Sequence, residues 1–208
     1  MARYKDADCK LCRREKIKLY LKGTKCETPK CPVEKRPFPP GQHGRARTKE
    51  TEYLIRFREK QKAKRIYGVL EKQFRNTYDQ ATRMKGITGE NLLSLLELRL
   101  DNVLMRAGFA TSRDQSRQLV NHGHVLVNGR KLSIPAARLR VGDTVEVREK
   151  SRRMTPILHA LAITENRSTP GWLRVERESW RATVGDVPTR ADIDVPVQEQ
   201  LIVELYSK

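Results

Sequence analysis

Long hydrophobic runs are missing from this chain of 208 residues. Hydrophobic residues make up 38% of the chain and charged residues 33%. No apolar stretch approaches the roughly 20 residues that a helix needs to span a bilayer. The first residues, MARYK, are not followed by the apolar segment of a secretion signal. We therefore expect a cytoplasmic protein with small hydrophobic cores and no membrane partner.

Acidic residues are also in short supply. The chain carries 25 Asp and Glu against 43 Lys and Arg, a formal net charge of +18, so the expected partner is a polyanion. The net charge is +9 over residues 1–50, +5 over 51–100, +4 over 101–150 and zero over 151–208. The first three quarters should therefore face the polyanion, and the last quarter should pack or contact protein. An ordinary solvated basic surface is the alternative.

Cysteine is scarce, and all four cysteines fall in one short stretch, at Cys9, Cys12, Cys26 and Cys31. Structural disulfides are rare in the cytosol, so the spacing C-x2-C, thirteen residues, C-x4-C predicts one zinc ion held by four thiolates. Neighbouring lysines and arginines should ease thiolate formation. Zinc would also stabilise a segment that has little core of its own. An iron–sulfur cluster and a redox CxxC pair are the alternatives.

A loop rich in proline and glycine follows, from Lys35 to Arg47. Proline and glycine at this density exclude a helix and expose backbone N–H groups that can approach phosphate. Within the loop, His43 is placed to stack on a base or to bond a phosphate. The loop is thus expected to contact RNA, with a flexible linker as the alternative.

The most informative segment runs from Glu97 to Leu132. It reads as a helix, a second basic helix and a tight hairpin. Ser112 is followed by glutamine three residues later, which predicts a capping box at the start of the second helix. Arg113 and Arg117 are four residues apart and so lie on one helical face. Asn-Gly at positions 128 and 129 predicts the hairpin turn. Two helices propping up a hairpin with one cationic edge suit a nucleic-acid backbone.

The remaining segments predict an α+β protein without internal repeats. Residues 48 to about 81 should be helical with a boundary at Gly68, and one apolar stripe on them should pack in a core. Residues 141–147 alternate like a half-buried strand. Further strands are expected at 172–175, 180–184 and 201–205. The stripe consists of Ile66, Leu70, Phe74 and Tyr78.

Several motifs, in order and spacing, resemble a known family. RLD, SR, RQLV, HGH and VNG within the 97–132 segment resemble the S4 RNA-binding domain. With KRPFPPGQHGRAR, YGVLEKQFR and DVPVQEQLIVELYSK, the whole chain resembles the bacterial small-subunit ribosomal protein S4 family. The resemblance implies a zinc knuckle with the basic loop (1–47), a helical body (48–95, with 160–208 packing back on it) and an inserted S4 domain (96–159).

The resemblance also implies a function. Family members are primary rRNA binders that nucleate the five-prime domain of small-subunit rRNA and contribute to translational accuracy. They contact ribosomal protein S5, and some repress their own messenger RNA. The resemblance favours zinc over the other cysteine chemistries. Carried over onto the matching motifs, it implies rRNA contacts at Arg45, Arg47, Arg113, Arg117 and Lys131, to which the residues themselves add His43, His122 and His124.

Catalysis is not supported. Asp101 lies in an RLD context similar to that of pseudouridine synthases, but it falls inside the first helix of the RNA-binding segment and is expected to support a nearby arginine. The pair His122 and His124 has no nucleophile or third ligand near it in the sequence, so a turn that contacts RNA or closes a helix is preferred. We expect neither enzymatic activity nor a small-molecule substrate. The alternatives are an RNA-modifying enzyme and a zinc-containing regulator that binds DNA.

Overall fold

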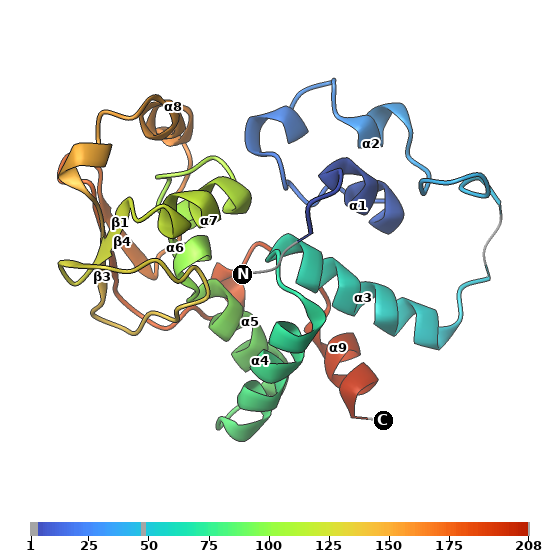
Figure 1. Cartoon of the computed structure of the whole chain (residues 1–208). Helices are drawn as coiled ribbons and strands as arrows, with labels where there is room; N and C mark the ends of the chain where they lie inside the picture. Colours follow the sequence, from blue (N-terminus) through green and yellow to red (C-terminus); the bar gives the residue numbers. More distant parts are fainter. Residues whose placement is uncertain (1–3, 47–48, 208) are drawn as a thin grey trace. The chain divides into compact units, whose positions relative to one another are not determined.

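The computed structural model describes residues 4–46 and 49–207 and divides into two compact units (Figure 1). Unit 1 comprises Met1–Leu92 and Val195–Lys208, and unit 2 comprises Leu93–Asp194. The sequence-based division instead assigns all of 160–208 to the helical body. In the structure only Val195–Lys208 of that segment belongs to unit 1, because two strands within 173–184 extend the sheet of unit 2.

Helices make up the secondary structure of unit 1 in the described residues. Thr51 caps the longest of them by accepting a hydrogen bond from the Leu54 N–H at 3.2 Å. The chain then turns at Gly68, whose φ of 61° favours glycine, so the predicted boundary between two helices is confirmed. The elements are α1 (Asp8–Glu15), the 3-10 turn η1 (Gly23–Cys26), α2 (Pro32–Lys35), α3 (Glu52–Ile66), α4 (Glu71–Arg83), the first half of α5 (Thr88–Glu97) and α9 (Glu199–Tyr206).

Helix α9 packs against α3 in unit 1. The Tyr206 ring lies 4.6 Å from that of Tyr78, and its hydroxyl donates to Glu71 at 3.0 Å. Burial would raise the pKa of Glu71, but hydrogen bonds from Lys60, Lys64 and Tyr206 outweigh it and lower that pKa to about 2. The strand predicted at 201–205 is therefore wrong. Residues there that favour strands form a helix because Ile202 and Tyr206, one turn apart, pack against the body.

Unit 2 combines helices with one antiparallel sheet of order β2-β1-β3-β5-β4. This arrangement confirms the predicted α+β class. The predicted Asn-Gly turn is also present, with φ of 50° at Asn128 and 77° at Gly129. The elements are the end of α5, α6 (Leu100–Arg106), α7 (Arg113–Asn121), β1 (Val125–Val127), β2 (Arg130–Lys131), β3 (Thr144–Val147), η2 (Glu149–Ser151), α8 (Thr155–Thr164), β4 (Leu173–Glu176), β5 (Arg181–Val184) and η3 (Arg190–Asp192).

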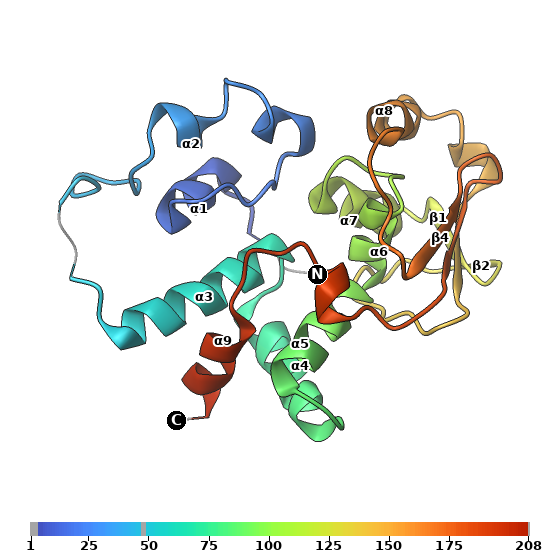
Figure 2. The same cartoon turned by 180° about the vertical axis from the view of Figure 1, so that it is seen from behind.

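The core of unit 2 lies between the sheet and α6 and α7, which both views show on the same side of it (Figures 1 and 2). Strand β3 alternates as predicted, with Val145 and Val147 buried. They pack with Leu104 of α6 and Val120 of α7 in one apolar cluster. Among the residues that the structure describes, no helix is both long and apolar enough to cross a membrane.

Candidate nucleic-acid interface

Helix α7 ends in a turn formed by the histidine pair. Ser112 begins the helix by accepting from the Gln115 N–H at 3.3 Å, which confirms half of the predicted capping box, but the Gln115 side chain accepts from the Thr111 N–H at 2.7 Å instead of from Ser112. At the other end, Gly123 has a φ of 73°, and the His124 N–H donates to the Leu119 carbonyl at 3.0 Å. This is a glycine C-cap, so the prediction that the turn closes a helix is confirmed.

Cationic side chains gather around this turn. The stem of Lys131 crosses Gly123 so closely that a Cβ built on the glycine would lie 2.1 Å from Lys131 Cε. Arg148 donates from Nη1 to the Gly123 carbonyl at 3.3 Å. The rings of His122 and His124 lie with centroids 6.0 Å apart. We call His122, His124, Lys131 and Arg148 the turn cluster; Arg148 was not predicted, although it directly follows the alternating strand.

The electrostatics of the turn cluster suit an anion. Burial lowers the pKa of His124, and the positive charges of His122, Arg148 and Lys131 lower it further. Its Nδ1 lies 2.9 Å from the Ser151 hydroxyl. A neutral imidazole can donate a hydrogen bond to a phosphate group, and exposed Lys131 and half-buried Arg148 beside it supply positive charge.

The two arginines of α7 differ in exposure. Arg113 is half-buried, and its Nε donates to Asn102 Oδ1 at 2.7 Å. Arg117 is only 4% exposed and lies 3.8 Å from Asp101. Arg99 donates two hydrogen bonds, of 3.0 and 2.6 Å, to the same Asp101 carboxylate. The expectation that Arg117 contributes to a cationic edge of the domain is therefore wrong, because Asp101 holds it inside the domain. The prediction that Asp101 supports a nearby arginine is confirmed.

A second cationic surface lies in unit 1, on the proline-rich loop. Its residues surround a hollow of about 740 Å³, which we call the loop hollow. Arg13 and Arg45 lie over the Phe38 ring, with guanidinium carbons 5.1 and 4.7 Å from its centroid. Arg13 also donates from Nε to the Phe38 carbonyl at 3.1 Å. The described lining residues are Arg14, Lys16, Pro37, Phe38, Pro39, Pro40, Gly41, Gln42, His43, Gly44, Arg45 and Ala46.

The loop hollow brings together two of the three predicted loop residues. His43 and Arg45 are exposed and line it, whereas Arg47 lies outside the described residues. Arg14 and Lys16 were not predicted as contacts, because their sequence neighbourhood is that of the cysteines. Only the fold places the end of α1 beside the loop.

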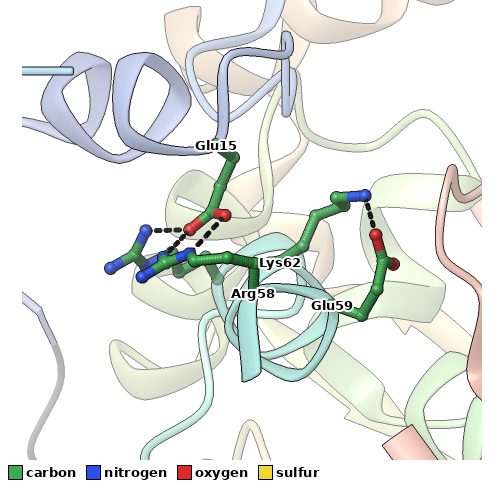
Figure 3. Close-up of polar contacts among 5 residues, drawn as sticks. Glu15, Arg58, Glu59 and Lys62 are labelled. Carbon is green, nitrogen blue, oxygen red and sulfur yellow. Dashed lines mark hydrogen bonds and ion pairs between the residues drawn. The ribbon is translucent and has the colours of Figure 1, made fainter. Parts of the chain in front are cut away.

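A buried carboxylate fixes that end of α1. Figure 3 shows Glu15 pointing from α1 toward Arg58 on α3. Arg58 Nε donates to Glu15 Oε2 at 3.1 Å, and Arg65 also binds the same carboxylate, whose side chain is 1% exposed. On α3 itself, Glu59 pairs with Lys62 (Figure 3). Because Glu15 separates Arg14 from Lys16, its ion pairs hold both lining cations in place.

The four cysteines occupy one neighbourhood in unit 1. Cys12, Cys26 and Cys31 are buried, Cys9 is half-buried, and all four are free thiols. Burial raises the pKa of Cys12 to about 11, and interaction with the other three sulfurs adds to this. The expected easing of thiolate formation by nearby cations is thus not seen at Cys12 or Cys26, where burial raises the pKa of the thiol. In the described part of the chain, no three His, Cys, Asp or Glu side chains are already arranged to hold a metal.

Comparison with known proteins divides the chain close to the first boundary between units 1 and 2. The family model described as ribosomal protein S4/S9 N-terminal domain matches residues 3–97, and the S4 domain matches residues 98–145. The small ribosomal subunit protein uS4 of Acidothermus cellulolyticus is 64% identical over 208 residues, covering 100% of both chains. The uS4 proteins of Frankia casuarinae and Dictyoglomus thermophilum are 60% and 57% identical, again over 100% of both chains. These matches confirm the resemblance.

Proposed function

The chain belongs to the ribosomal protein S4 family, and from that membership we propose that it is a structural, non-enzymatic constituent of the small ribosomal subunit in the cytoplasm. It binds rRNA with the turn cluster and Arg113 in unit 2 and with the loop hollow in unit 1. An RNA-modifying enzyme is not favoured, since Asp101 is 3% exposed and held by arginine.

The loop hollow is the observation that carries the RNA-binding proposal. Its described lining includes four cationic or imidazole side chains and no carboxylate, although the chain has 25 acidic residues. Cationic side chains that bind RNA phosphates there would release the counterions condensed on the RNA, so affinity should fall steeply with salt. Specificity would come from the shape of a folded RNA junction, because side chains cannot read the narrow major groove of A-form RNA.

Competitive binding at near-physiological salt tests this function. The protein is offered a folded fragment of the small-subunit rRNA five-prime domain and an unrelated structured RNA of equal length. We expect a preference of about a hundredfold or more for the fragment, the scale of specific over non-specific nucleic-acid binding. Equal affinity for the two RNAs would show that net charge acts alone and would contradict the proposal.

A pair of charge reversals makes this test local. Lys131→Glu changes the turn cluster, while Arg174→Glu makes the same change at an exposed position of β4, in the neutral last quarter of the chain. The first should lower affinity for the fragment and reduce the salt dependence, and the second should change neither. Equal losses for the two variants would remove the turn cluster from the interface.

We further propose that the four cysteines bind one zinc ion. The donor set and the electrostatic contact among all four sulfurs support this, and the Lys22 N–H, 3.4 Å from Cys26 Sγ, supplies a hydrogen bond that suits a thiolate. Cys9, Cys12, Cys26 and Cys31 would be the ligands. Zinc bound there would tie α1 to the segment before α2 and so stabilise the amino-terminal fold.

Metal analysis of the purified protein tests the zinc site. We expect about one zinc per chain in the unmodified protein and none in Cys26→Ser, because a four-thiolate site needs every ligand. Thr28→Ser, at an exposed position two residues further on, is the control and should keep the metal. Hydrogen exchange in Cys26→Ser should rise in residues 8–35 and stay unchanged in unit 2. Stoichiometric iron, or no metal at all, would refute the zinc site.

The remaining family roles are part of the same proposal. Nucleation of the rRNA five-prime domain follows if the two surfaces join separate RNA helices. The neutral segment 151–208 is the part proposed to contact ribosomal protein S5 and so to influence accuracy. A crosslinking map that places S5 only on residues before 100 would exclude this. Binding to its own messenger RNA would use the same cationic surfaces.

A further inference from the structure

A carboxylate is buried at the end of α5 in unit 2. Glu97 is 0% exposed and binds the guanidinium of Arg106 through two hydrogen bonds, of 3.1 Å from Nε and 2.9 Å from Nη2. It also accepts from Asn102 Nδ2 at 2.6 Å. A buried charge needs such partners, and these hydrogen bonds hold the carboxylate in place.

Glu97 sets the orientation of the Asn102 amide. Asn102 is 1% exposed, and its Nδ2 donates both to the Glu97 carboxylate and to the Glu97 main-chain carbonyl, at 2.6 and 2.9 Å. Both of those groups can only accept hydrogen bonds, so the amide NH₂ must face them. The amide oxygen therefore faces the opposite way, toward α7.

The oxygen of Asn102 meets Arg113 there. Arg113 Nε donates to Asn102 Oδ1 at 2.7 Å, a short hydrogen bond from a charged donor. Since the guanidinium is planar, fixing Nε fixes the direction of the whole group. Arg113 is the first residue of α7 and half-buried. The Nε end of its guanidinium is thus held by a chain of hydrogen bonds that runs from Glu97 through Asn102.

We propose that Asn102 is a positioning residue for RNA binding: held by Glu97, it aims the Arg113 guanidinium at an RNA phosphate. The inference rests on the proposed function and adds to it a buried residue that itself touches no RNA. It assigns to the asparagine a role that neither its burial nor its neutral side chain suggests. Removing Asn102 should weaken RNA binding through Arg113 alone.

A double-mutant cycle on the full chain tests this. Affinity for the five-prime-domain fragment is measured over a range of salt for the unmodified protein, Asn102→Ala, Arg113→Ala and the double variant. Arg113→Ala should lower affinity about tenfold and reduce the salt slope by about 1, as for one lost phosphate contact. Asn102→Ala should lower affinity about fivefold, and in the Arg113→Ala background it should have almost no further effect. Asn166→Ala, at an exposed position, is the matched control.

Arg113→Lys keeps the test decisive where Asn102→Ala fails to fold. Lysine preserves the charge and leaves Glu97 and Asn102 intact, but it lacks the planar fork that Asn102 orients. Its affinity should fall most of the way to that of Arg113→Ala. Affinity equal to that of the unmodified protein, or independent losses in the double variant, would overturn the inference.

The outcomes separate this inference from the function beneath it. If Arg113→Ala binds unchanged while the fragment is still preferred over unrelated RNA, the positioning role falls and the proposed function stands. If the unmodified protein shows no preference for the fragment, the proposed function falls, and the positioning role falls with it.

Discussion

Replacing Arg117 by glutamate is expected to destabilise unit 2 strongly rather than only to weaken RNA binding. Arg117 and Asp101 are 4% and 3% exposed and lie 3.8 Å apart, and Arg99 binds both oxygens of the same carboxylate. Glutamate would place a second carboxylate beside Asp101 in a site that excludes water. Breaking a buried ion pair costs about 3–5 kcal/mol, and like charges add to this.

That cost is large against the whole stability of a domain, which is about 5–15 kcal/mol. We expect the melting temperature of unit 2 to fall by about 15 °C or more, since 1 kcal/mol shifts a domain of this size by about 4–8 °C. Hydrogen exchange of residues 98–147 in the full chain would localise the loss. Arg130→Glu makes the same charge change on exposed β2 and should leave exchange and melting unchanged.

The opposite result is easy to recognise. An Arg117→Glu protein that melts within about 2 °C of the unmodified protein has lost well under 1 kcal/mol of stability. If it also failed to bind rRNA, Arg117 would belong to the RNA surface, as its spacing from Arg113 predicts. The experiment therefore decides between the expectation from spacing and the burial that the structure shows.

The parts of unit 2 that follow local rules could be predicted from the sequence. Ser112 caps α7, Asn128 and the glycine after it form the hairpin turn, and Gly123 closes α7. Each of these depends on the preferences of a few adjacent residues. The grouping of His122, His124 and Lys131 follows from those turns, so much of the turn cluster was also predictable.

Contacts between distant residues could not be predicted in this way. Spacing places Arg113 and Arg117 on one helical face but does not say that Asp101 lies beneath part of it. The pairing of β3 with β5, which joins Thr144 to Thr183, depends on residues about forty positions apart. Arg148 enters the turn cluster only because β3 ends beside Gly123. The buried role of Asn102 is hidden for the same reason.

Replacing Glu15 by glutamine is expected to loosen the amino-terminal segment from α3 in unit 1. The Glu15 side chain is 1% exposed and its carboxylate binds both Arg58 and Arg65, so the neutral amide would leave two guanidinium groups of like charge side by side. Burial already lowers the pKa of Arg65, and Glu15 opposes that shift. Both arginines are partly exposed, so solvent reduces the cost of a broken buried pair to about 2 kcal/mol.

Hydrogen exchange and urea unfolding would measure this loss. Exchange in Glu15→Gln should rise over residues 8–35 and over residues 58–65 of α3, which include both arginines, with no change in the β-sheet of unit 2. Glu52→Gln removes a carboxylate that is 83% exposed and pairs with Arg56, and it should cost less than about 0.5 kcal/mol. Equal exchange in the two variants would show that the Glu15 ion pairs do not hold α1.

The same substitution should reach the RNA-binding surface without removing any of its cations. Arg14 and Lys16 flank Glu15 and line the loop hollow, so a mobile end of α1 would leave both charges present but no longer arranged. Net charge rises by one in Glu15→Gln, which on its own would favour a polyanion. A lower affinity for the rRNA fragment would therefore mean that arrangement, rather than charge alone, determines binding at this surface.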